Sequence, residues 1–152
     1  MTVRRAEMAE APEVMRVIND AFRPAESFFV EGDRIGLDQV RQHFGKGVFL
    51  VTEDVGGVVY VELRGERAYF GLLSVDPAKQ GGGVGKKLIA AAEGHARAAG
   101  CAYMDIHVVN LRTELPPFYR SLGYEVTGTE EFHGEPVKMP CHFIVMSKKL
   151  VG

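Results

Sequence analysis

The sequence predicts a three-layer α/β domain, in which helices cover both faces of a mixed, mostly antiparallel sheet of about seven strands. Three observations lead to this fold class. The 152 residues suit one domain with a sizeable core. Helical and strand patterns alternate along the chain, and some strands are joined by turns short enough for antiparallel neighbours. No repeat or linker divides the chain, so residues 1–152 are expected to form a single unit.

The first quarter of the chain predicts a strand and two helices. Residues 2–6 have a short strand pattern, and residues 11–21 place apolar side chains three and four positions apart, as in an amphipathic helix. Pro24 is expected to end this helix. Residues 25–37 form a long irregular connection, a kind of segment that often carries function. A short helix is predicted next, over residues 38–44.

Three strand patterns follow in the middle of the chain, over residues 48–53, 58–64 and 68–75. Only short turns separate them. Connections of this length join antiparallel neighbours, so these strands are expected to form a meander.

The second half of the chain predicts a parallel unit. A strong helix is expected over residues 84–99, with Gly100 as its C-terminal stop. The preceding strand, this helix and the strand over residues 103–109 should form a right-handed crossover within the sheet. Three further elements are a helix over residues 116–122 and strands over residues 124–131 and 141–148.

Composition and charge are typical of an ordinary globular protein. Apolar residues make up 46% of the chain, charged residues 25%, and the formal net charge is −2. Nucleic acid and membrane surfaces are not expected as partners, because both attract clustered Lys and Arg. No apolar run approaches the roughly 18–20 residues of a membrane span, and the first residues carry charges where a signal peptide is apolar. We therefore expect a cytoplasmic protein.

The two cysteines carry no metal or redox motif. Cys101 and Cys141 stand alone, with no C-x-x-C pattern and no His at zinc-binding spacing. Both are expected to be small buried residues, and no metal site is predicted.

The turn before the long helix is rich in glycine and reads Gln80-Gly81-Gly82-Gly83-Val84-Gly85-Lys86-Lys87. It combines a chain almost without side chains, free N–H groups and the positive end of a helix dipole, which together favour a phosphate group. Lys86 and Lys87 oppose that dipole unless an anion lies between them. The alternative is that the glycines form only a tight turn.

Two common phosphate motifs do not fit this turn. A P-loop requires Gly five positions before Gly85 and Ser or Thr after Lys86, but the chain has Gln80 and Lys87 there. A dinucleotide fingerprint starting at Gly83 requires Gly or Ala at Leu88, and one starting at Gly81 requires it at Lys86.

The turn and its flanking segments resemble the GCN5-related N-acetyltransferase (GNAT) superfamily. Gln80-x-x-Gly83-x-Gly85 matches its central motif, and Leu73-Ser74-Val75-Asp76-Pro77 resembles the end of its fourth strand. Downstream, Phe118-Tyr119-Arg120-Ser121-Leu122-Gly123-Tyr124 resembles its FYxxLGF segment, and Asn110 follows the fifth strand, where an Asn is frequent. These motifs span about residues 47–132.

The resemblance implies an acyl-CoA N-acyltransferase type of fold with a splayed parallel strand pair. The turn over residues 80–86 would hold the pyrophosphate of acetyl-CoA, the cosubstrate. The pantetheine arm would pair with the backbone at Leu73, Ser74 and Val75. Asn110 would hydrogen-bond pantetheine, or would only end its strand.

The activity implied is direct transfer of an acetyl group to an amine of a small molecule or peptide, as in an acyltransferase that moves groups other than aminoacyl groups. Tyr119 matches the family's general acid, although a packed aromatic is the alternative. Glu62 is a candidate general base acting through water, or else a solvated strand residue. His107 and His142, on predicted strands, are further candidates because a neutral imidazole titrates in the useful range. His107 shares a strand face with Asp105, and a hydrogen-bonded pair between these two is the favoured interpretation.

The connection over residues 25–37 corresponds to one wall of the acceptor site in this superfamily. Glu26, Phe28 and Phe29 would bind an amine that carries apolar surface, or the aromatics would pack on the core. A CoA-binding sensor or scaffold without turnover is the alternative function. Dimerisation through the last strands stays open.

Overall fold

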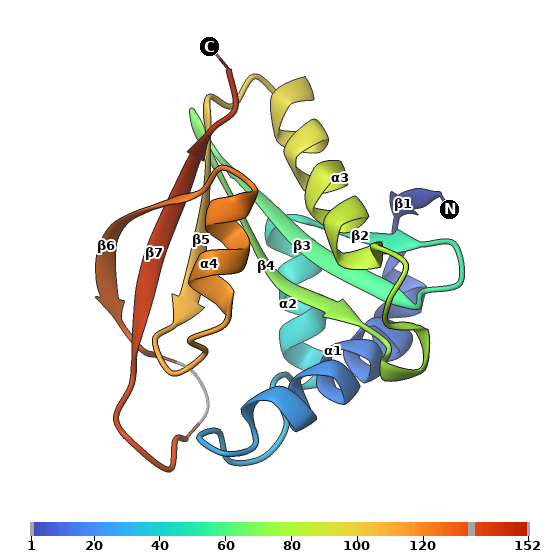
Figure 1. The fold of residues 1–152 in the computed structure, drawn as a ribbon. Coiled ribbons are helices and arrows are strands. Elements are labelled where there is room, and N and C mark those ends of the chain that lie inside the picture. The colour runs from blue at the N-terminus through green and yellow to red at the C-terminus, as the bar shows by residue number, and fades with distance from the viewer. Residues whose placement is uncertain (1, 134–135, 152) are drawn as a thin grey trace.

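The computed structural model describes residues 2–133 and 136–151, and these contain a seven-stranded sheet in the order β1-β2-β3-β4-β5-β7-β6 (Figure 1). The strands are β1 Val3–Arg5, β2 Val48–Thr52, β3 Gly57–Arg64, β4 Arg67–Val75, β5 Tyr103–Val109, β6 Glu125–Glu131 and β7 His142–Lys149. The helices are α1 Ala11–Glu26, α2 Leu37–Lys46, α3 Val84–Ala98 and α4 Leu115–Ser121, with 3-10 turns η1 Met8–Glu10 and η2 Pro77–Lys79. The predicted fold class is confirmed.

The sheet is antiparallel except between β4 and β5, as the short turns and the long crossover helix predict. The parallel pairing is brief. It runs from the Arg67–Tyr103 pair to the Tyr69–Asp105 pair and then stops, although both strands continue. Beyond Tyr69 and Asp105 the two strands therefore separate.

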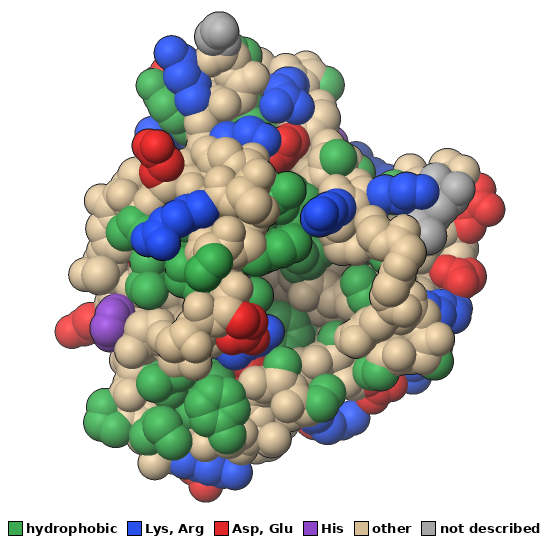
Figure 2. Space-filling model, viewed as in Figure 1, with side chains coloured by type: hydrophobic (Ala, Val, Ile, Leu, Met, Phe, Trp, Pro, Cys, Tyr) green, Lys and Arg blue, Asp and Glu red, His purple; other side chains and the backbone are tan. Residues whose placement is uncertain are grey.

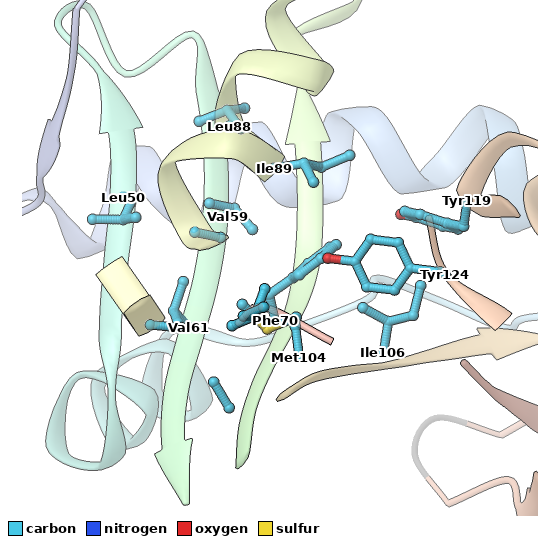
Figure 3. Packing of buried hydrophobic residues seen from close by; sticks show 14 of the residues in the cluster. Leu50, Val59, Val61, Phe70, Leu88, Ile89, Met104, Ile106, Tyr119 and Tyr124 are labelled. Carbon is cyan, nitrogen blue, oxygen red and sulfur yellow. The ribbon is translucent and has the colours of Figure 1, made fainter. Parts of the chain in front are cut away.

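Helices α3 and α4 pack on one face of the sheet, and α1 and α2 pack on the other (Figure 1). The core under α3 and α4 contains Phe70 of β4, whose ring packs at a tilt against Tyr119 and edge-to-face against Tyr124 (Figure 3). The core under α1 contains Leu72, only two positions after Phe70. In a regular strand these two side chains would share a face. An irregularity in β4 between them explains the reversal and is described with the site below.

Helix α1 continues through Pro24 to Glu26, so the predicted stop at Pro24 is wrong. Pro24 has no N–H to donate, so one helical hydrogen bond is missing at this position, but the contacts that follow it keep the chain helical. The Ser27 N–H still donates to the Arg23 carbonyl oxygen (3.0 Å), and the Glu26 carboxylate is held by Arg112 (2.9 Å).

The two cysteines are free thiols. Cys101 is 1% exposed, as expected, whereas Cys141 is only half-buried, because it lies just before β7 at the border of a small cluster around Phe29 and Phe143. Within residues 2–133 and 136–151, no helix has the length and hydropathy needed to cross a membrane.

Candidate active site

A cavity of about 870 Å³ opens where β4 and β5 separate. This size is typical of small-molecule sites. Its walls include Tyr119 of α4, on one face of the sheet, and Tyr69 and Pro24 on the other face. The cavity therefore passes through the gap between the two strands. Figure 2 shows a hollow between α3 and α4 on the face that these helices cover.

A bulge in β4 shapes this gap. Tyr60 of β3 pairs with Gly71 but Val58 pairs with Ser74, so β4 has one extra residue over this stretch. Leu72 takes the strained left-handed conformation, with φ of +56°. The bulge reverses which side chains face α3, and it turns the β4 backbone at the point where β5 no longer pairs with it. Leu73, Ser74 and Val75, the residues predicted to pair with pantetheine, line the cavity.

The glycine turn forms one end of the cavity. Gly81, Gly82 and Gly83 have φ of 97°, 68° and 76°, a conformation that costs residues with a Cβ about 1 kcal/mol or more. The first hydrogen bond of α3 runs from the Lys87 N–H to the Gly83 carbonyl oxygen (3.1 Å), so the preceding N–H groups have no helical partner. Of the predicted set, all but Gly82 line the cavity: Gln80, Gly81, Gly83, Val84, Gly85 and Lys86.

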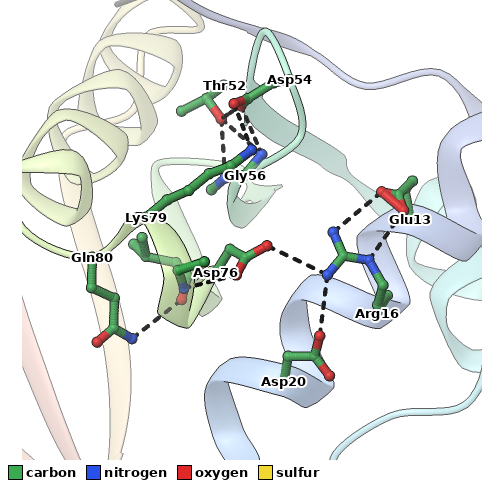
Figure 4. A network of polar contacts seen from close by, with 12 residues as sticks. Glu13, Arg16, Asp20, Thr52, Asp54, Gly56, Asp76, Lys79 and Gln80 are labelled. Carbon is green, nitrogen blue, oxygen red and sulfur yellow. Dashed lines mark hydrogen bonds and ion pairs between the residues drawn. The ribbon is translucent and has the colours of Figure 1, made fainter.

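The segment before this turn is anchored on both sides (Figure 4). The Asp76 carboxylate accepts from the Ala78 N–H (3.0 Å) and pairs with Arg16 of α1 (3.4 Å). The Lys79 ammonium pairs with Asp54 in the β2–β3 turn (2.6 Å), and this contact, more than any other, lowers the pKa of Asp54. These contacts attach η2 to α1 and to the β2–β3 turn, so the glycines begin from a fixed position.

Tyr119 lies on the α4 side of the gap, where Phe70 and Tyr124 pack against its ring (Figure 3). It is 7% exposed and lines the cavity, and among the described residues its hydroxyl has no hydrogen-bond partner. Burial raises the pKa of Tyr119 to about 12. At neutral pH the phenol is therefore protonated and able to donate.

Glu62, the predicted base, does not line the cavity. Its carboxylate accepts from the Tyr60 hydroxyl (2.8 Å) and from the Arg64 guanidinium (2.9 Å). Burial alone would raise the pKa of Glu62, but these two hydrogen bonds outweigh it and hold the pKa below its ordinary value. Its position and lowered basicity give the predicted role no support.

Asn110 joins the ends of two strands. Its N–H donates to the His142 carbonyl oxygen (2.9 Å), and its side-chain oxygen accepts from the His142 N–H (2.8 Å). It is not part of the cavity wall. These bonds match the strand-ending alternative, and the pantetheine role stays a prediction.

The end of α1 forms the opposite end of the cavity. Glu26 lines it, 7% exposed and paired with Arg112 (2.9 Å). Phe28 is 50% exposed and Phe29 is fully buried in the small cluster, so neither side chain lines the cavity. The aromatic wall instead comes from residues that sequence reasoning missed: Phe22, Tyr69, Phe132 and Phe143.

The expected pair between His107 and Asp105 is wrong. Asp105 accepts from Arg67 (2.7 and 2.8 Å) and Ser147 (2.6 Å), which lie on the adjacent strands β4 and β7. Residues two apart on a strand share a face, but their side chains bond more readily to neighbours across the sheet. His107 is free of Asp105 and lines the cavity.

The described part of the chain holds no group of three or more His, Cys, Asp or Glu side chains placed to bind a metal ion. The walls of the cavity consist of main-chain N–H groups, one open strand edge, aromatic rings and a few titratable side chains.

A family description, "Acetyltransferase (GNAT) domain", matches residues 45–126, more than half of the 152 residues. The chain belongs to the GNAT acetyltransferase family. No curated protein matches it in sequence.

Solved structures share the fold over nearly the whole chain. The ribosomal-protein-S18-alanine N-acetyltransferase of Escherichia coli has a TM-score of 0.78 and 15% identity, covering 99% of this chain and 94% of its own. yncA of Salmonella typhimurium, solved with its cofactor acetyl-CoA, has a TM-score of 0.73 and 23% identity, covering 100% and 95%. The paia N-acetyltransferase of Thermoplasma acidophilum, in complex with coenzyme A, has a TM-score of 0.76 and 16% identity, covering 97% and 98%.

Proposed function

We propose that this protein is an N-acetyltransferase that moves the acetyl group of acetyl-CoA directly to an amine of a small molecule or peptide. One observation carries the proposal. A single cavity joins the glycine turn to the opened strand pair, to the Tyr119 phenol and to the polar and aromatic end at α1. The Salmonella and Thermoplasma relatives bind acetyl-CoA and coenzyme A, which supports the same cosubstrate here.

The chain offers each part of acetyl-CoA a distinct partner. N–H groups of the turn and the Lys86 ammonium suit the pyrophosphate. Among the described residues, the β4 edge at Leu73 and Val75 has no strand partner on the side of the gap, so a pantetheine amide can pair with it. Asn110, at the end of β5, is the remaining proposed contact.

Two groups act on the reacting atoms. A main-chain N–H at the β4 bulge polarises the thioester carbonyl, because a fixed donor stabilises the charge that develops on that oxygen. Tyr119 gives its proton to the departing sulfur. Both require the thioester to lie in the gap between β4 and β5.

The acceptor amine is proposed to enter from the α1 side. Glu26 is the acidic group on that wall, and Arg112 orients its carboxylate. Tyr69 and Phe143 supply apolar surface. Phe28 and Phe29 belong to the same connection but support the wall from outside the cavity.

The first test is a pair of glycine substitutions on α3. Gly85 lines the cavity and has no atom within 4 Å of an added Cβ, so Gly85→Val should fold while its side chain blocks the approach of the pyrophosphate. Gly94→Val is the matched control, since Gly94 lies on the same helix in open space and outside the cavity. By isothermal titration, Gly85→Val should weaken acetyl-CoA binding by about 10²-fold or more, a loss of about 2.7 kcal/mol, and Gly94→Val should match wild type.

The same titration with ATP and NAD should show no binding. Absence of acetyl-CoA binding by folded wild-type protein would contradict the proposal. Binding without release of free thiol across a panel of amines would favour the sensor or scaffold function instead.

A further inference from the structure

The gap between β4 and β5 begins at a defined residue on each strand. The last parallel pair joins Tyr69 to Asp105, and both side chains lie on the α1 face. The next residues on that face are Gly71 and His107, which flank the point where the strands separate. Both line the cavity, and because Gly71 has no Cβ, the Tyr69 side chain lies against its backbone on this face.

The imidazole of His107 is held by packing rather than by hydrogen bonds. Its ring lies 5.3 Å from the Tyr69 ring and 5.3 Å from the Phe143 ring, and the side chain is 19% exposed. Glu130 is the nearest carboxylate, at 3.6 Å from Nε2, which is beyond a hydrogen bond. Among the described residues no hydrogen bond reaches either ring nitrogen, so the ring is oriented and its nitrogens stay available to a ligand in the cavity.

His107 and Tyr119 lie on opposite faces of the sheet, on either side of the gap. Tyr119 packs in the core under α3 and α4, whereas His107 faces α1 and contacts Tyr69. General acid–base catalysis of this transfer uses a proton acceptor within reach of the nucleophile and a proton donor within reach of the leaving group. This arrangement supplies both through one cavity.

We propose that His107 is the general base that takes the proton from the attacking amine. The proposal rests on the proposed acetyltransferase function. The neutral amine forms a C–N bond with the acetyl carbonyl carbon, and its surplus proton passes to a ring nitrogen of His107. The C–S bond breaks, and the thiolate takes the Tyr119 proton. The imidazolium then releases its proton to solvent, from which the Tyr119 phenolate regains one.

The charges around His107 suit this role. Burial, the largest cause, lowers the pKa of His107 below its ordinary 6.5, and Arg64 of β3 and His133 act in the same direction. Glu130 of β6 and Asp105 of β5 act in the opposite direction, and Tyr69 of β4 is protonated because burial raises its pKa. The imidazole is therefore neutral at pH 7, and Glu130 stabilises the imidazolium when it forms.

The test compares wild type, His107→Gln and His95→Gln, a control on α3 outside the cavity. Acetyl-CoA affinity by isothermal titration should agree within about threefold for all three proteins. In a free-thiol assay with 2-phenylethylamine or a Phe-Gly dipeptide, His107→Gln should lower kcat about 10²- to 10⁴-fold. Wild type should also lose activity below pH 6.5 more steeply than protonation of the amine explains, and this extra fall should be absent in His107→Gln.

A second measurement needs no acceptor. The imidazole NMR signal of His107, assigned by its loss in His107→Gln, should titrate below 6.5 and shift when acetyl-CoA is added, while the His95 signal should not shift. A His107 signal indifferent to acetyl-CoA, or a variant rate within about threefold of wild type, would overturn the proposal. Loss of acetyl-CoA binding in wild type would instead count against the acetyltransferase function itself.

Discussion

The Tyr119 side chain is largely buried and lines the cavity, and its hydroxyl has no hydrogen bond among the described residues. No fully buried side-chain oxygen or nitrogen in that part of the chain lacks a partner, so the hydroxyl oxygen is open to the cavity rather than enclosed in the core. A ligand atom in the gap, which on the proposed function is the thioester sulfur, would supply the missing partner. The catalytic alternative of the sequence prediction thus gains support over simple packing, although the ring also packs in the core.

Replacing this hydroxyl should affect turnover but not binding. Tyr119→Phe should lower kcat about 10²-fold, because the thiolate must then leave without a proton donor, and acetyl-CoA affinity by titration should stay near wild type. Tyr103→Phe is the matched control, since the Tyr103 hydroxyl also has no hydrogen bond among the described residues and lies outside the cavity. Unchanged kcat in Tyr119→Phe would leave that residue a packing role only.

At the scale of elements, the Glu26–Arg112 ion pair connects the end of α1 to the segment just before α4, between positions 86 residues apart. The two side chains are 9% and 16% exposed, so water screens the pair only weakly. Arg112 also pairs with Glu114 (2.9 Å), just before α4. The end of α1 is held in the cavity wall through these contacts, and this is where the helix continues past Pro24.

Breaking this pair should destabilise the fold. Arg112→Met leaves the Glu26 carboxylate buried without its arginine, and the free energy of unfolding should fall by about 3 kcal/mol. The double variant with Glu26→Gln should recover most of that loss in urea denaturation, because no buried charge remains. Arg41→Met, which removes an exposed contact to Asp38 (3.9 Å), should change stability by less than about 0.5 kcal/mol. Equal losses at Arg112 and Arg41 would contradict this account.

Over the whole molecule, several carboxylates have pKa values below their ordinary range in the folded state: Glu10, Asp54, Glu62, Asp76, Asp105 and Glu114. Glu10 is a clear example. The Arg4 guanidinium of β1 and the Glu7 N–H hold the pKa of the Glu10 carboxyl at about 2. A carboxyl group whose pKa is lower in the folded state than in the unfolded state stabilises the fold at pH values above the unfolded-state pKa. This stabilisation is lost as the pH falls through the folded-state pKa.

Stability should therefore decrease between about pH 4.5 and pH 2, measured by thermal unfolding across that range. Glu10→Gln should flatten part of this decrease, because its carboxylate no longer titrates. Glu66→Gln, at an exposed carboxylate with no hydrogen bond among the described residues, should keep the wild-type profile. An unchanged slope in Glu10→Gln would show that the Arg4 contact contributes little in solution.

The sequence by itself determined the order of the elements, the antiparallel meander, the crossover helix and the glycine turn. Each depends on local information: hydrophobic periodicity, turn length, or the left-handed conformations that Gly81 to Gly83 adopt most easily. The family motifs lie in the same local segments, which is why the sequence alone predicts a site at the glycine turn.

Only the tertiary structure decided where β4 and β5 separate and which side chains face the gap. The β4 bulge at Leu72 reverses the alternation on which strand patterns rely. Hydrogen-bond partners decided the rest. Tyr60 and Arg64 donate to the Glu62 carboxylate, and Arg67 and Ser147 donate to Asp105. His107 therefore has no bond to Asp105 and lines the cavity. A side chain bonds to the partner that folding brings closest, and strand pairing and packing select that partner from distant parts of the chain.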